Sequence, residues 1–149
     1  MYEELLKAVD QELLSASAAV QPPGSPETLE KLEKMAQAIF SRGLPPEYAE
    51  FLKHMDGLNW NGLMIYASST RVAADPENSF IQGFVEANLL WRDYDPNKAY
   101  LIFAESGLSK YVFNIATSEY QILDRSSMER VKSVGSFEEL ITNAVTDHL

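Results

Sequence analysis

The side chains that could carry out acid–base or metal chemistry are few in this sequence and are widely spaced. There are two histidines, His54 and His148, and no cysteine. Thiolate zinc sites and thiol nucleophiles are therefore excluded, and neither histidine belongs to a metal-binding spacing such as His-Glu-x-x-His. We interpret His54 as a solvated or dipole-facing residue near a helix end, and His148 as part of a frayed C-terminus.

Two pairs of acidic residues could divide the roles of general acid and general base, namely Asp93 with Asp95 and Asp75 with Glu77. Burial is what raises the pKa of such a carboxyl group, but both pairs lie in polar, proline-containing segments, so we interpret them as solvated. The sequence also contains neither a GxSxG turn nor a GxxxxGK[S/T] phosphate loop. A binding protein is therefore favoured over an enzyme, and we expect no metal and no cofactor.

The composition restricts the class of partner. The 149 residues carry 12 Lys and Arg against 22 Asp and Glu, which gives a formal net charge of −10. Binding to a nucleic acid backbone relies on clustered cations, so a nucleic acid partner is not expected. No apolar run approaches the roughly 18 residues that cross a bilayer, and we expect a cytoplasmic protein with no membrane contact. Two interpretations of the acidic surface stay open, which are solubility and attraction of a basic partner.

The first half of the chain reads as three helices. The apolar spacing predicts a helix over residues 2–19, followed by the breaker sequence QPPGSP. A second helix should begin with Ser25 as N-cap and Pro26 in the first turn, and Gly43 should stop it. A third, short helix lies in LPPEYAEFLKHMDG and should end at Asp56-Gly57.

The second half of the chain reads as mostly β-structure. Asn61-Gly62 predicts a tight turn before the β-prone segment 63–67. A polar excursion follows, and then FIQGFVEANLLW (80–91) could form a short helix with Phe84, Ala87, Leu90 and Trp91 on one side. The segments 99–105, 110–115, 119–124 and 130–134 should form an antiparallel meander, before a helix that Ser136 and Glu139 open as a capping box. The fold class is therefore a single α+β domain: N-terminal helices, a mostly antiparallel sheet, and a C-terminal helix on the sheet.

Several of these motifs together resemble a known family. The segment LPPEYAEFLKHMDGLNWNGLMIYA is similar to the LPxxYxxFLxxxNG region of the SUKH superfamily, in particular its YrhA-like branch, and VEANLLW, AYLIFAES, KYVFNIATSEYQILDR and GSFEELI follow in the order of that branch. The resemblance covers roughly residues 25–145 of one domain, in which residues 1–24 form an N-terminal helix and connection. The motif positions with a structural role are Leu44, Pro45, Tyr48, Phe51, Leu52, Asn61, Gly62 and Phe137.

The resemblance implies a non-catalytic protein-binding module. Many superfamily members are bacterial immunity proteins that neutralise a toxin, often a nuclease, and a nuclease presents a basic surface that suits an acidic partner. No catalytic residues carry over, and we expect a monomer or a weak dimer. The alternative is a small-molecule-binding or regulatory cytoplasmic domain without a toxin partner, which should contain a pocket where polar groups converge on apolar walls.

A protein-binding surface should concentrate its affinity in aromatic anchors ringed by charged residues. We therefore predict that the partner contacts a set of aromatic and acidic residues in the loops, with the last two included only if the polar excursion folds back. These residues are Trp60, Trp91, Asp93, Tyr94, Asp95, Asp75 and Glu77. For both tryptophans, packing against the hydrophobic core is the alternative.

Overall fold

The computed structural model describes residues 2–15, 21–72 and 80–148, and it confirms the α+β fold class. Its helices are α1 (Tyr2–Ser15), α2 (Pro26–Phe40), α3 (Pro46–His54), α4 (Phe84–Trp91), α5 (Phe137–Thr146) and the 3₁₀ helix η1 (Asp95–Ala99). Its strands are β1 (Leu58–Trp60), β2 (Leu63–Ile65), β3 (Arg71–Val72), β4 (Phe80–Ile81), β5 (Tyr100–Glu105), β6 (Ser109–Asn114), β7 (Glu119–Asp124) and β8 (Arg130–Val134).

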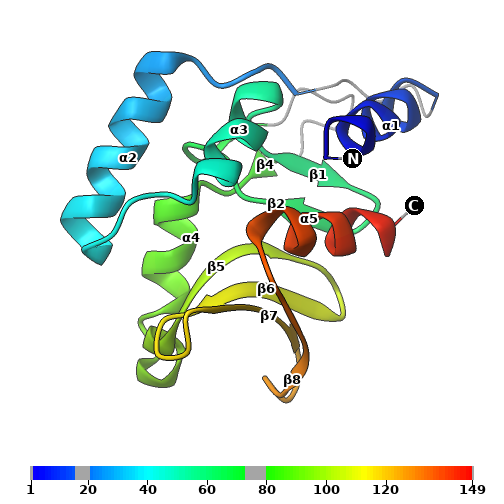
Figure 1. Cartoon of the computed structure of the whole chain (residues 1–149). Helices are drawn as coiled ribbons and strands as arrows, with labels where there is room; N and C mark the ends of the chain where they lie inside the picture. The colour runs from blue at the N-terminus through cyan, green and yellow to red at the C-terminus, as the bar shows by residue number, and fades with distance from the viewer. Residues whose placement is uncertain (1, 16–20, 73–79, 149) are drawn as a thin grey trace.

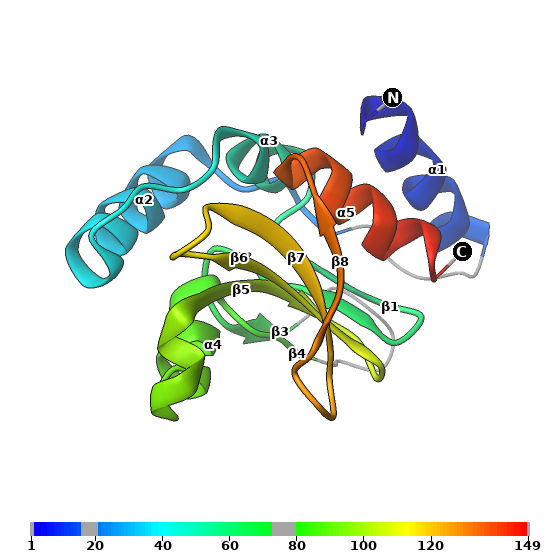
Figure 2. The same cartoon turned by 60° about the horizontal axis from the view of Figure 1, so that its bottom comes forward.

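Six strands form one antiparallel sheet in the order β1-β2-β5-β6-β7-β8, and β3 pairs with β4 separately. The predicted meander is confirmed, since β5 to β8 follow one another in the sheet. Figures 1 and 2 show α3 and α5 on one side of the sheet, with α1 beyond α5, and α4 running beside β5. The predicted C-terminal helix therefore packs on the sheet as expected, and its Phe137, Leu140 and Ile141 are buried.

The helix starts follow the sequence signals more closely than the helix ends do. Ser25 caps α2 by accepting a hydrogen bond from the Thr28 amide at 3.1 Å. The predicted stop at Gly43 is wrong, because α2 ends at Phe40 and Ser41 takes the left-handed conformation with φ 59°. The first predicted helix is present as α1, and the remainder of its predicted range, residues 16–19, lies outside the described residues.

The loop after α3 depends on Asp56 and Gly57. The buried Asp56 carboxylate accepts hydrogen bonds from the Ser68 amide and hydroxyl, both at 2.7 Å, and so ties the end of α3 to the segment after β2. Gly57 has φ 88°, and a Cβ atom there would lie 2.8 Å from the Cβ of Ala67. Only glycine combines this backbone conformation with this close approach.

A strand that the sequence analysis missed, β1, precedes the Asn61-Gly62 turn. Trp60 pairs with Leu63 across the turn, and Asn61 and Gly62 have φ 53° and 82°. Two positive φ values in a two-residue loop are typical of a type I′ hairpin turn, so the predicted tight turn is confirmed. The strand was missed because a run of three residues is too short for a periodic pattern.

The helix predicted over residues 80–91 is only partly correct. Phe80 and Ile81 belong to β4, which pairs with Arg71–Val72, and α4 begins at Phe84 after the extended Gly83. Leu90, which was predicted on the buried side, is 72% exposed. A helix that is apolar on all sides gives no stripe by which the buried face could be recognised.

Four aromatic rings meet where the helices cover the sheet. The ring of Tyr48 on α3 lies 5.5 Å from Phe84, 5.2 Å from Phe103 and 5.3 Å from Phe137, measured between centroids. Tyr48 is fully buried, and its hydroxyl donates to the carbonyl of Tyr66 at 2.7 Å. The cluster therefore joins α3, α4, α5 and β5 in the core, and it satisfies its one polar group.

The side chain of Asn88 on α4 forms hydrogen bonds to the backbone of β5 beyond the point where β2 ends. Its side-chain amide donates to the Ile102 carbonyl at 2.9 Å and accepts from the Ile102 amide at 2.8 Å, and a third hydrogen bond runs to the Phe84 carbonyl at 2.8 Å. Asn88 has no exposed surface. A side chain thus replaces the missing strand partner of a buried backbone segment and fixes α4 against the sheet.

We predict that Asn88→Ala lowers the free energy of unfolding by about 3 kcal/mol, because it leaves the buried amide and carbonyl of Ile102 without partners. Urea unfolding followed by circular dichroism measures the change. The matched control is Asn143→Ala on α5, since Asn143 also donates to the carbonyl four residues earlier, but at a half-buried position and in a solvent-exposed hydrogen bond. Equal losses in the two variants would contradict the role given to Asn88.

Candidate functional site

The structure separates the predicted partner-binding residues into two groups. Trp60 ends β1 at the β1–β2 hairpin, where the neighbouring Asn61 donates to the carbonyl of His148 at 2.6 Å. Trp91 ends α4, and Figures 1 and 2 both place this end of α4 far from the hairpin. Trp60 therefore does not share a surface with the group around Trp91. Asp75 and Glu77 lie outside the described residues.

Both tryptophans are half-buried and pack against the hydrophobic core. The ring of Trp91 lies 6.1 Å from that of Tyr100, and the ammonium group of Lys110 lies 6.0 Å from the Trp91 ring centroid. These contacts give each indole a structural role. A contact between either tryptophan and a partner stays a prediction.

The two histidines are held by contacts that the sequence did not indicate. His54 lies in the last turn of α3 with its side chain 35% exposed, as interpreted, and its Nε2 also lies 2.9 Å from a carboxylate oxygen of Asp10, so it connects α3 to α1. His148 was interpreted as frayed, yet its Nδ1 lies 2.7 Å from the Ala144 carbonyl oxygen. Within residues 2–15, 21–72 and 80–148, no three His, Asp or Glu side chains gather as metal ligands would.

The outer side of α4 and the residues after it form a partly apolar, acidic surface. Leu89, Leu90 and Tyr94 are 51%, 72% and 67% exposed. Asp93 and Asp95 are also exposed, as predicted, and a hydrogen bond from Lys98 at 2.8 Å lowers the pKa of Asp95. We call these five residues the α4 surface. Large exposed apolar side chains beside charged ones are typical of a protein contact.

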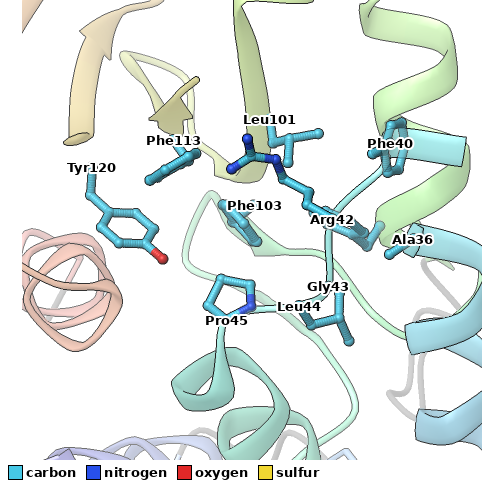
Figure 3. A pocket seen from close by; sticks show the side chains of 11 residues that line it. Ala36, Phe40, Arg42, Gly43, Leu44, Pro45, Leu101, Phe103, Phe113 and Tyr120 are labelled. Carbon is cyan, nitrogen blue, oxygen red and sulfur yellow. The ribbon is translucent and has the colours of Figure 1, made fainter. Parts of the chain in front are cut away.

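A pocket of about 170 Å³ opens between the α2–α3 loop and the sheet (Figure 3). Its volume lies below the range of roughly 300–1,000 Å³ typical of drug-sized ligands, and is close to the roughly 150 Å³ of an engineered cavity that binds benzene. It is therefore large enough for one side chain or one small ring. The lining residues are Ala36, Phe40, Arg42, Gly43, Leu44, Pro45, Phe84, Leu101, Phe103, Phe113 and Tyr120.

Two arginines stack on rings that line this pocket. The guanidinium of Arg42 lies 5.2 Å from the Phe113 centroid, and that of Arg92 lies 5.1 Å from the Phe40 centroid. Burial lowers the pKa of Arg92, and the positive charge of Arg42 lowers it further, so the two cations repel each other. Neither arginine belongs to an ion pair among the described residues.

Tyr120 contributes a polar group to the opposite side of the pocket. In Figure 3 its hydroxyl points toward Pro45, while Arg42 extends toward Phe113. Burial and the negative charge of Glu47 raise the pKa of Tyr120 to about 12, against the opposing effect of Arg42. Tyr120 therefore keeps its proton at neutral pH. Its hydroxyl makes no hydrogen bond to any residue that the structure describes.

The sequence analysis missed Arg42, Arg92, Phe113 and Tyr120 as members of one site. They come from the α2–α3 loop, the end of α4, β6 and β7, and no spacing in the chain connects these elements. The available signal was the motif pair Leu44 and Pro45, which was interpreted as structural and which also lines the pocket.

No protein-family model and no curated protein matches this chain. The resemblance to the SUKH superfamily thus stays a prediction from its motifs. Among the residues that the structure describes, no helix is both long enough and apolar enough to span a lipid bilayer.

We predict that Tyr120→Phe reduces the loss of stability at alkaline pH. An unfolded tyrosine releases its proton near pH 10, whereas folded Tyr120 holds it to about pH 12. The folded state therefore binds more protons in this interval, and stability falls as the pH rises from 10 to 12. Urea midpoints at pH 8 and pH 11 should differ less in the variant, and an equal difference in both proteins would contradict the burial of Tyr120.

Proposed function

We propose that this chain is a non-catalytic protein-binding module that contacts its partner through the α4 surface. The observation that supports this proposal is the exposure of Leu89, Leu90 and Tyr94 on and after a helix whose other side is buried. Leaving three large apolar side chains in water is unfavourable, and a partner that covers them would recover about 25 cal/mol for each Å² of apolar area.

The negative charge of the chain favours a basic partner. Asp93 and Asp95 flank Tyr94, Asp95 is paired with Lys98 at 2.8 Å, and the whole chain has a formal net charge of −10. An acidic surface attracts a basic protein over several ångströms and increases the rate of encounter. We therefore propose an immunity protein whose partner is a toxin domain with a basic surface, such as a nuclease, as the resemblance to the SUKH superfamily implies.

We predict that Leu90→Asp weakens binding to the partner roughly thirtyfold, because the central apolar contact of an interface contributes about 2 kcal/mol or more. The measurement is calorimetric titration with the polypeptide encoded beside this chain in its own genome. Leu108→Asp is the matched control, since Leu108 is 82% exposed on the β5–β6 turn and does not belong to the α4 surface. Both positions are exposed, so both variants should unfold within about 0.5 kcal/mol of the parent.

Two outcomes of this titration would count against the proposal in different ways. If the neighbouring polypeptide does not bind the parent protein, the assignment as an immunity protein to that polypeptide is wrong. If it binds, and Leu90→Asp and Leu108→Asp have the same affinity, the interaction exists but the α4 surface does not make it.

We predict that the double variant Asp93→Lys, Asp95→Lys slows association with the same polypeptide about tenfold at low ionic strength, and less in 0.5 M salt, because salt screens the attraction. Stopped-flow measurements give the rates. Glu12→Lys with Glu129→Lys makes the same change in net charge at exposed positions on α1 and the β7–β8 turn. Equal slowing by both double variants would show an effect of net charge alone.

A further inference from the structure

We propose that the pocket between the α2–α3 loop and the sheet binds a small aromatic carboxylate, with the ring between the aromatic walls and the carboxylate on Arg42. Phenylacetate has the required size and chemistry. The site is separate from the α4 surface, and it does not depend on the proposed protein partner.

The walls of the pocket suit a planar apolar group. Phe84 and Phe103 stack on each other at 5.1 Å and belong to the buried core, so this part of the wall is rigid. Phe113 and Phe40 line the pocket nearer to the arginines. A volume of about 170 Å³ holds one benzene-sized ring with little space to spare.

The polar groups suit a carboxylate. Arg42 lines the pocket, and its guanidinium offers a fork of N–H donors that matches the two oxygens of a carboxylate. Stacking on Phe113 restrains this guanidinium before any ligand arrives. The Tyr120 hydroxyl offers a further donor to the bound molecule from the other side of the pocket, because it holds its proton and has no partner in the described part of the chain.

The charges around the pocket are consistent with an anion. Arg42 and Arg92 repel each other, and the buried Arg92 Nε has no hydrogen-bond partner. An anion near Arg42 would relieve that repulsion. Two carboxylates also border the site and partly offset the arginines: Glu33, which accepts a hydrogen bond from the Leu44 amide at 2.8 Å, and Glu47, which accepts one from the Glu138 amide at 3.1 Å.

The loop that carries Arg42 is fixed by its own backbone. Ser41 takes the left-handed conformation and turns the chain sharply after α2. The hydrogen bond from the Leu44 amide to Glu33 then ties the loop back to α2. Arg42 is therefore presented by an ordered segment, which reduces the entropy that binding would cost.

A titration of the full chain followed by NMR tests the proposal, with the methyl groups of Leu44 and Leu101 reporting on the pocket. One arm uses phenylacetate and its neutral analogue phenylacetamide. The other arm uses the dipeptide N-acetyl-glycyl-phenylalanine and its C-terminal amide. Binding of phenylacetate would indicate a free small acid as the natural ligand, and binding of the dipeptide acid alone would indicate the C-terminus of a polypeptide.

We expect at least one acid to bind more than tenfold tighter than its amide, because the arginine distinguishes a charged from a neutral group. Arg42→Gln should weaken that acid roughly tenfold or more, and Tyr120→Phe about fivefold. Arg130→Gln is the matched control, since it removes the same charge at an exposed position on β8 and should leave the affinity unchanged.

Three results would overturn the proposal. The first is that neither acid shifts the methyl signals of Leu44 and Leu101. The second is that each amide binds as tightly as its acid, which would remove the role of Arg42 as the carboxylate partner. The third is that Arg42→Gln and Arg130→Gln weaken binding equally, which would mean that net charge rather than the pocket determines the affinity.

Discussion

The packing of Tyr48, Phe84, Phe103 and Phe137 is the constraint on which the rest of the structure depends. These four rings come from α3, α4, β5 and α5, and each lies within 5.5 Å of Tyr48 or Phe103 between centroids. Because aromatic side chains bury a large area in a defined geometry, their contacts fix the distance of three helices from one strand. The hydrogen bond of the Tyr48 hydroxyl to the Tyr66 carbonyl also requires one rotation of the ring, since a buried hydroxyl without a partner is costly. Phe84 and Phe103 line the pocket as well, so the same packing sets the shape of the candidate site.

The short length of β2 determines where α4 lies. β2 pairs with β5 at Ala104 and Glu105, and beyond this point the edge of β5 needs another partner. Asn88 supplies it, and a helix bound through one buried amide side chain must turn one face to the sheet and the other to solvent. The outward face carries Leu89 and Leu90. The exposed apolar residues thus follow from the way in which the sheet edge is completed.

The sequence was sufficient to predict those features of the structure that a local signal determines. Ser25 before Pro26, the Asn61-Gly62 turn and the alternating segments of the meander each carry their information in a few consecutive residues, and all three predictions are confirmed. It was not sufficient to predict features that depend on contacts between residues far apart in the chain. The left-handed Ser41 and the exposure of Leu90 depend on packing, and the pocket combines the α2–α3 loop with α2, α4, β5, β6 and β7. The pairing of His54 with Asp10 joins residues 44 positions apart, which no spacing rule can reveal.

The negative charge of the whole chain and the cationic pocket do not conflict, because they act over different distances. At physiological ionic strength the field of exposed charges decays over about 8 Å, so the surface carboxylates influence the approach of a large partner but only weakly affect a ligand enclosed beside Arg42. Beside the aromatic rings that line the pocket the local dielectric is lower than in bulk water, which strengthens the attraction between a guanidinium and a carboxylate at contact. In the two proposals, therefore, the acidic exterior acts on the approach of a protein partner, while the pocket distinguishes small groups by charge and shape. Arg92 follows α4, and its guanidinium lies 5.1 Å from the centroid of the pocket ring Phe40, so one cation stands between the end of α4 and a wall of the pocket.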